Sequence, residues 1–403
     1  MVPGRPGRSG GAPRVRRVPW PRDAAYAGSG HDVAVRRLLR TLAVCAALTC
    51  CTSPGLVPVP GTDARSPRAE RTYAYGPHAR QRVAVHWHPE RSADRTRRPA
   101  VVVLHGGFWR LDAAPGWRGW CRTLADRGLV VFDVEYRRNL DARWPAQRDD
   151  VLSALAWIRQ RGERFGVDPE RLVLLGSSAG GHLATSVGAY GAGARRVAGV
   201  AALSPVVDPL RSWRTGAAYG AGAGHGAPVR PTPRAREERE VRGGPDGDRT
   251  ARPTPPDART PPARADRPAY AARVRAARQR GVRENAALLA GCRPARGDGE
   301  RAAACAEVWR DMSAAAHASG KDDAPLLLVH SAWDFVPAAH SRELARAERA
   351  RGMPRRSVTV RTVPGAAHGG GLLRAPGVLP ALLAWLDARV DAGADGAADG
   401  RDR

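Results

Sequence analysis

Lysine is almost absent from this 403-residue chain, whose only lysine is Lys321 although its formal net charge is +26. Arginine therefore supplies the positive charge. Residues 1–40 contain nine arginines and two aspartates, and residues 211–280 contain sixteen arginines and seven acidic residues. Aromatic residues do not interleave these runs as stacking on bases would require, so we expect no nucleic-acid partner. Nucleic-acid binding by the second run is an alternative that predicts steeply salt-dependent affinity.

The sequence also lacks the local motifs that hold metals, phosphates and dinucleotides. No Cys/His cluster has metal-ligand spacing, and no phosphate loop or dinucleotide fingerprint is present, so we expect neither a metal ion nor a cofactor. Among the six cysteines, Cys292 and Cys305 are close enough in the sequence to form a local disulfide, which export would permit. Cys121 is expected to be a small buried apolar residue.

The N-terminal region resembles an export signal rather than part of a fold. Basic residues 36–40 precede the apolar run 42–48, which is too short to span a bilayer, and the run ends at a lipoprotein-like box. We expect lipidation at Cys51, with Cys50 as the alternative. The interpretation divides this region into a leader at 1–34, which either precedes the true start of the protein or is disordered, a signal at 35–51 and a linker at 52–69. It predicts an exported protein, secreted or lipid-anchored on the outer face of the cytoplasmic membrane.

Short apolar runs alternating with helical patterns predict an α/β fold with a mostly parallel, doubly wound sheet. We expect helices over 149–161 and near 378–386, and a catalytic domain formed by 70–210 and 307–390, followed by a disordered tail at 391–403. The expected strands are 71–75, 82–88, 100–104, 129–134, 171–175, 197–203 and 357–363, with a further strand and the loop after it within 324–337.

Residues 211–306 differ from the rest of the chain because they are rich in Arg, Pro, Gly and Ala and have few large apolar residues. A packed core there is not expected. We interpret the segment as an insertion at a cap position, largely disordered over 216–266, with a basic helix over 270–289. A tolerated low-complexity insertion is the favoured reading, and a functional lid is the alternative.

Gly176-Ser177-Ser178-Ala179-Gly180 places a serine between a strand-like and a helix-like run. This G-x-S-x-G pattern is typical of a nucleophile elbow, in which a tight turn exposes the serine hydroxyl at a helix N-terminus. Only Ser178 has glycines two residues away on both sides. The pattern therefore predicts that Ser178 is a nucleophile.

Three further strand ends carry residues that suit this chemistry. His105-Gly106-Gly107 follows the strand at 100–104, as an oxyanion loop would, and we expect His105 to brace that loop. Asp334 and His368 follow later strands, which gives the order Ser, Asp, His. A serine hydroxyl needs a histidine to take its proton and a carboxylate to orient that histidine.

With these motifs the chain resembles α/β-hydrolase serine esterases, namely bacterial acetyl- and feruloyl-esterase-like enzymes and hormone-sensitive-lipase-like carboxylesterases. The resemblance covers about residues 70–210 and 312–390 and is carried by segments 105–109, 134–137, 176–184, 334–337 and 365–369. It implies that Ser178 is the nucleophile, His368 the general base and Asp334 its orienting acid. It also implies that the oxyanion donors are Gly106, Gly107 and Ala179.

The resemblance predicts hydrolysis of small acyl or aryl esters through an acyl-enzyme, with Phe108 and Trp109 as aromatic walls of the substrate site. H-G-G followed by an aromatic residue and Trp also occurs in kynurenine-formamidase-like amidohydrolases, so the sequence leaves ester and formamide substrates open. A non-catalytic binding protein on a hydrolase scaffold is an alternative of another class.

Overall fold

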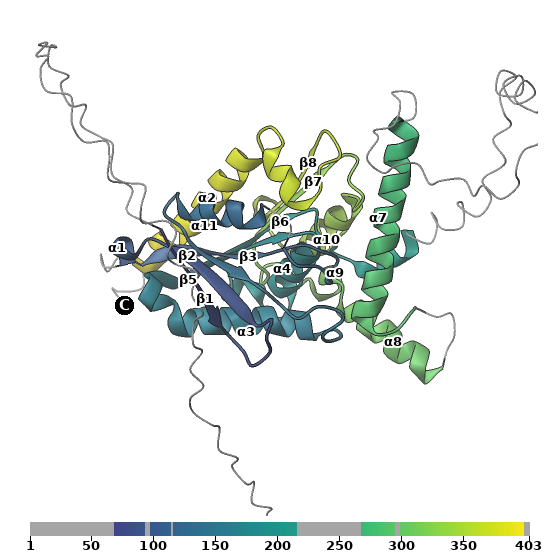
Figure 1. Cartoon of the computed structure of the whole chain (residues 1–403), viewed down its shortest axis with the longest axis horizontal. Coiled ribbons are helices and arrows are strands. Elements are labelled where there is room, and N and C mark those ends of the chain that lie inside the picture. The colour runs from purple at the N-terminus through teal and green to yellow at the C-terminus, as the bar shows by residue number, and fades with distance from the viewer. Residues whose placement is uncertain (1–67, 93–96, 114–115, 216–266, 295–298, 399–403) are drawn as a thin grey trace, which may run out of the picture. The chain divides into compact units, whose positions relative to one another are not determined.

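Eight strands form one mixed sheet in the part of the chain that the structure describes. The structure is a computed structural model, and it describes residues 68–92, 97–113, 116–215, 267–294 and 299–398. The strand order is β1-β2-β4-β3-β5-β6-β7-β8 (Figure 1). β2 pairs antiparallel with both β1 and β4, whereas every other pairing is parallel. The predicted fold class, a mostly parallel α/β sheet, is confirmed.

The strands coincide with the apolar runs of the sequence. The central parallel strands are rich in Val, Leu and Ala and are buried on both faces, as strands covered by helices on each side must be. β5 begins earlier than predicted and ends at Ser177, directly before Ser178. The bounds are β1 Ala69–Ala74, β2 Arg82–Trp87, β3 Arg98–Leu104, β4 Val130–Val134, β5 Val167–Ser177, β6 Gly199–Leu203, β7 Leu326–Ser331 and β8 Val358–Val363.

Helices cover both faces of the sheet and create two cores. α2 (Trp117–Ala125) and α11 (Val378–Ala398) pack on one face, around residues such as Leu382. α3 (Ala146–Arg161), α4 (Ala179–Ala189) and α10 (Ala339–Ala350) bury apolar side chains on the other (Figure 1). The remaining short helices are α1 Pro89–Ser92, η1 Gly162–Phe165, η2 Gly193–Arg195, α9 Ala314–His317, η4 Arg355–Ser357 and η5 Gly369–Arg374.

The described part of the insertion is more ordered than its composition predicts. α7 (Arg267–Ala290) spans the predicted basic helix, and α8 (Glu300–Asp311) crosses the predicted boundary at residue 306. A disulfide joins Cys292 to Cys305, as the sequence predicts. Val282, Ala286 and Leu289 are buried in the larger core. The expectation that this segment has no packed core is therefore wrong for α7, because these three residues are spaced four and three apart and so share one face of the helix. Residues 216–266 lie outside the described residues.

Predictions for the two ends of the chain have different outcomes. The leader, the export signal and the lipidation of Cys51 fall within residues 1–67, which lie outside the described residues, so they stay predictions. α11 continues to Ala398, so the tail predicted from residue 391 begins within a helix. Among the helices that the structure describes, none has the length and apolar character needed to span a membrane.

Candidate active site

Ser178 lies in a sharp turn between β5 and α4. Its backbone has φ 54° and ψ −112°, a conformation that costs a non-glycine residue strain. The flanking glycines make the turn sterically feasible, because a Cβ on Gly180 would lie 2.1 Å from the carbonyl oxygen of Leu104, and one on Gly176 would lie 2.4 Å from the carbonyl oxygen of Gly180. The structure therefore has the strand–turn–helix geometry that the pentapeptide predicts.

Asp334 and His368 are brought together from the ends of β7 and β8. His368 Nδ1 lies 2.7 Å from Asp334 Oδ1. An ionised carboxylate can only accept hydrogen bonds, so Nδ1 carries the proton and Nε2 is left to accept one. The Asp334 side chain is fully buried, and His368 lines a cavity together with Ser178. The structure thus places all three predicted residues at one site.

The pKa of the Asp334 carboxyl is held well below its usual range. Burial alone would raise this pKa, but contacts with His330 and His368 and the hydroxyl of Ser204 outweigh that penalty. The backbone N–H of Val336 also donates to Oδ1, at 3.0 Å. Asp334 is therefore an anion at neutral pH, as the orienting partner of a protonated imidazole must be.

Two serines hold the backbone that follows His368. Ser204, fully buried after β6 with φ 53°, donates its hydroxyl proton to Asp334 Oδ2 and accepts the backbone N–H of Gly369 at 2.9 Å. Ser177 Oγ accepts the N–H of Gly370 at 3.1 Å. The acid, the histidine loop and the nucleophile turn are thus joined by direct hydrogen bonds.

The oxyanion loop is fixed through its carbonyl groups. Tyr136 donates its hydroxyl to the carbonyl oxygen of His105 at 2.8 Å, and His105 Nδ1 donates to that of Gly106 at 2.6 Å. In a trans peptide the next N–H points opposite to the carbonyl, so these bonds set the direction of the Gly106 and Gly107 N–H groups. Both glycines line the cavity. Ala179 begins α4, where a helix leaves its first N–H groups without intrahelical acceptors.

His105 braces this loop, as predicted, and it does not line the cavity. Its Nε2 lies 3.4 Å from Glu135 Oε2. Burial lowers the pKa of His105, but the hydrogen bond and charge of Glu135 outweigh it and raise the pKa above its ordinary value. The charged form of His105 donates from both ring nitrogens. By favouring that form, Glu135 keeps a proton on Nδ1 for the hydrogen bond to the Gly106 carbonyl oxygen.

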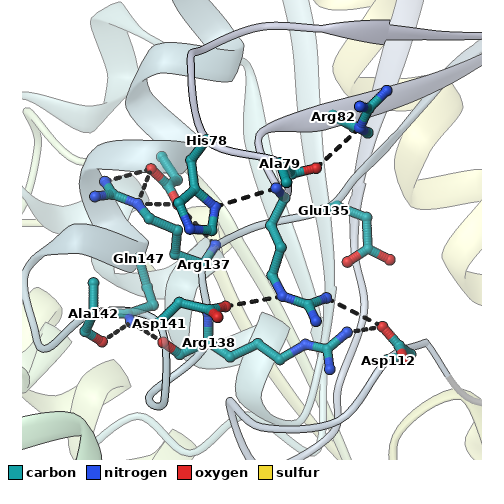
Figure 2. A network of polar contacts seen from close by, with 12 residues as sticks. His78, Ala79, Arg82, Asp112, Glu135, Arg137, Arg138, Asp141, Ala142 and Gln147 are labelled. Carbon is teal, nitrogen blue, oxygen red and sulfur yellow. Dashed lines mark hydrogen bonds and ion pairs between the residues drawn. The ribbon is translucent and has the colours of Figure 1, made fainter.

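Figure 2 shows a network of polar contacts around Asp112, Arg138 and Asp141. Asp112, which lines the cavity, pairs with Arg80 at 3.3 Å and with Arg138, and Arg80 also reaches Asp141 at 2.9 Å. Deeper in the fold, Arg137 NH2 lies 2.6 Å from the fully buried Asp150. These contacts connect the loop after β4 to the wall of the cavity.

The cavity beside Ser178 has a volume of about 460 Å³ and aromatic walls. Phe108 lies over Phe335 with ring centroids 6.1 Å apart, and Phe335 in turn contacts the His368 ring at 3.9 Å. Trp117 and Trp120 of α2 supply a further wall. Phe108 therefore lies where the sequence predicts.

Trp109 does not line the cavity, which corrects the prediction that it contacts substrate. Its side chain is 1% exposed, and its indole Nε1 donates to His182 Nδ1 at 3.1 Å. His182 Nε2 donates to the carbonyl oxygen of Met312 at 2.7 Å, and burial lowers the pKa of this histidine to about 4. Trp109 and the neutral His182 therefore support the fold behind the site.

The sequence interpretation missed several residues at the site. Ser204 carried a usable signal, because it directly follows β6 just as Ser178, Asp334 and His368 follow other strands. The parallel strands end at one edge of the sheet, where ligands of α/β proteins bind. Trp117, Trp120 and Arg374 line the cavity without a local sequence signal that marks them.

Comparison with known proteins agrees with this fold. Residues 101–229 match a protein-family model described as the alpha/beta hydrolase fold. Solved structures include esterase B from Lactobacillus rhamnosis, with TM-score 0.54, 19% identity and coverage of 83% of this chain and 89% of that one. Carboxyl esterase 2 from Tuber melanosporum gives TM-score 0.52 and 17% identity, with coverage of 83% and 89%. The chain has the α/β-hydrolase fold.

Curated relatives match over shorter stretches. Esterase LipQ of Mycobacterium tuberculosis is 28% identical over 127 residues, which are 31% of this chain and 30% of LipQ. Carboxylesterase NlhH of the same species is 34% identical over 115 residues, 28% of this chain and 35% of NlhH. Arylacetamide deacetylase of Oryctolagus cuniculus is 36% identical over 110 residues, 26% of this chain and 28% of that protein. The matches thus span about a third of these relatives, and the resemblance to carboxylesterases of the hormone-sensitive-lipase-like type is confirmed.

Proposed function

We propose that this chain is a serine carboxylic-ester hydrolase that forms an acyl-enzyme on Ser178. The observation that carries the proposal is the 2.7 Å contact between His368 Nδ1 and Asp334 Oδ1, with His368 and Ser178 on the wall of one cavity. The named esterases among the relatives support the same reaction class.

The residues have complementary roles in the proposed reaction. Ser178 Oγ attacks the ester carbonyl carbon while its proton passes to His368 Nε2, and Asp334 stabilises the imidazolium that forms. The Gly106, Gly107 and Ala179 N–H groups receive the developing oxyanion, and loss of one such donor costs about 10²–10³ in rate. His368 then protonates the leaving alcohol. A water molecule, deprotonated by His368, releases the acid and restores Ser178.

The cavity favours small acyl or aryl groups. Its volume of about 460 Å³ lies at the lower end of typical ligand sites, and Phe108, Phe335 and Trp117 give it broad apolar surfaces. We therefore expect turnover of acetyl and butyryl esters to exceed that of octanoyl esters. Faster turnover of the long-chain ester would refute this substrate class.

The test compares the full chain with two variants on p-nitrophenyl acetate, butyrate and octanoate, methyl ferulate and N-formylkynurenine. Ser178→Ala should lower kcat for esters by at least about 10⁴-fold, because it removes the nucleophile. Ser186→Ala is the matched control: Ser186 is fully buried and lies outside the cavity lining, and its hydroxyl has no hydrogen-bond partner in the described part of the chain. We expect the control to retain wild-type rates.

The outcomes separate the alternatives. Ester hydrolysis that is lost only in Ser178→Ala supports the proposal. Preference for N-formylkynurenine would instead identify an amidohydrolase that uses the same residues. Equal rates in wild type and Ser178→Ala would refute a catalytic Ser178, and a folded protein inactive on the whole panel would favour the non-catalytic binding protein.

A further inference from the structure

Three potential metal ligands meet in the interior, away from the cavity beside Ser178. They are His86 of β2, Cys121 of α2 and Asp133 of β4, and one ligand atom of each lies within 4.8 Å of the others. His86 and Cys121 are fully buried, and Asp133 is partly buried. None of the three lines the candidate active site.

The fold brings these side chains to one face of the sheet. His86 is paired with Val131, and Ala84 with Asp133, so His86 and Asp133 are diagonal neighbours on adjacent strands. Alternation along a strand places residues two apart on the same side, and Val131 belongs to the core beneath α2. Cys121 faces that core from α2. Since the three lie far apart in the sequence, no local spacing reveals them.

His86 provides the observation that points to a ligand. Among the residues that the structure describes, neither of its ring nitrogens has a hydrogen-bond partner, although the side chain is fully buried. An unsatisfied buried polar group is costly, and an unoccupied ion site is one of its explanations.

Glu70 adds a second feature of a metal-binding histidine. It is paired with His86 across β1 and β2, and its Oε2 lies 3.4 Å from His86 Nδ1. Histidines that bind metals commonly direct their other ring nitrogen at a carboxylate, which orients the ring. Arg118 and Arg122 in turn each lie 3.3 Å from Glu70 and hold it in place.

We propose that His86, Cys121 and Asp133 form a buried binding site for one zinc-class divalent cation. Imidazole nitrogen, thiolate sulfur and carboxylate oxygen are all donors that Zn²⁺ accepts, and the three supply most of a four-coordinate set. A hard cation such as Mg²⁺ is excluded by the sulfur and nitrogen donors, because it prefers oxygen.

The local charges allow a cation despite the nearby arginines. Arg118 and Arg122 are paired with Glu70, and Arg68 lies 2.6 Å from Asp126. The thiolate and Asp133 then bring negative charge to the cation. Binding would tie α2 to the sheet, and α2 carries Trp117 and Trp120 of the cavity wall.

The test uses the full chain after removal of metals with a chelator. Zn²⁺ should bind with a stoichiometry of one and raise Tm in a concentration-dependent manner. Co²⁺ should give a near-ultraviolet absorption band that reports cobalt–thiolate ligation. His86→Gln and Cys121→Ser should abolish both effects, and Glu70→Gln should weaken binding by about 10-fold.

In the unprocessed full chain, Cys50 and Cys51 are the matched control, because they are cysteines elsewhere in the same chain. The double variant Cys50→Ser, Cys51→Ser should keep the cobalt band and the Zn²⁺-dependent Tm shift. A band that disappears in this double variant, or persists in Cys121→Ser, overturns the proposal. If the ligand variants fail to fold, the wild-type Tm decides: no rise with Zn²⁺ overturns the site. None of these readouts depends on esterase activity.

Discussion

Replacing Ser204 with alanine should slow the proposed reaction without altering the cavity. Ser204 is absent from the cavity lining, but its hydroxyl is bonded to both the acid and the loop of the proposed triad. Alanine removes the donor to Asp334 Oδ2 and leaves the N–H of Gly369 without its acceptor. Ser204 is thus a positioning residue that acts through Asp334 and His368.

The size of the effect follows from the bonds that are lost. A hydrogen bond to a charged group contributes about 1.5–3 kcal/mol, and each 1.4 kcal/mol of barrier is tenfold in rate. Asp334 keeps His368 at 2.7 Å and the Val336 N–H at 3.0 Å, so its charge remains partly satisfied. We therefore expect kcat for p-nitrophenyl acetate to fall about 10- to 100-fold, with KM nearly unchanged.

The assay separates positioning from loss of stability. Steady-state kinetics of Ser204→Ala should be measured with urea unfolding of the same preparation, beside Ser186→Ala. The control removes an equally buried serine hydroxyl that has no hydrogen-bond partner. Ser204→Gly tests the backbone, because glycine adopts the φ of 53° without strain yet also lacks the hydroxyl. It should be as slow as Ser204→Ala.

Two results would refute the argument. Wild-type kcat in Ser204→Ala would show that His368 and Asp334 hold their positions unaided. A kcat restored by Ser204→Gly would show that backbone strain, rather than the hydroxyl, accounts for the loss. If KM also rises while kcat stays at the wild-type value, Ser204 is assigned to substrate binding.

Three further predictions concern stability, each measured by urea unfolding. Asp150→Ala leaves the Arg137 guanidinium without its buried partner and should lower the free energy of unfolding by about 3 kcal/mol. Burial lowers the pKa of His182 to about 4. In the unfolded chain His182 is protonated as the pH falls through about 6.5, whereas in the folded chain it stays neutral down to about pH 4. The contribution of His182 to the free energy of unfolding is therefore complete above pH 6.5 and falls by up to about 1.4 kcal/mol per pH unit between pH 6.5 and pH 4. The fall should be smaller in His182→Gln. Reducing the Cys292–Cys305 disulfide should lower the free energy of unfolding by up to about 3 kcal/mol. Equal unfolding midpoints with and without reductant would contradict this prediction.

The strands and the three proposed catalytic residues could be predicted because their signals are local. A central parallel strand is buried on both faces, so its sequence is an uninterrupted apolar run. The residues that follow its carboxyl end lie at the ligand-binding edge of the sheet. Asp334 satisfies that rule. Asp322 and Asp323 precede β7 and lie at its other end, so the order of strand and acid distinguished between them.

The failures arise where side-chain direction or distant packing decides. Phe108 and Trp109 are adjacent and both have positive φ, of 57° and 54°, yet one lines the cavity and the other is buried against His182. A buried indole needs an acceptor for its N–H, and the position of that acceptor depends on α4. The meeting of His86 and Cys121 likewise depends on α2 lying over the sheet, which no spacing along the chain encodes.

Several arginines of helix α7 contact aromatic rings of the fold. Arg278 lies 5.5 Å from the ring centroid of Phe335, and Arg283 lies 4.2 Å from that of Trp213. A Cβ on Gly281 would lie 3.4 Å from Phe108, so the helix packs closely over the aromatic wall of the cavity. Guanidinium groups stack favourably on aromatic faces, which accounts for these arginines through contacts within the fold. Because Phe335 also contacts His368, α7 packs against an aromatic residue that borders the candidate site.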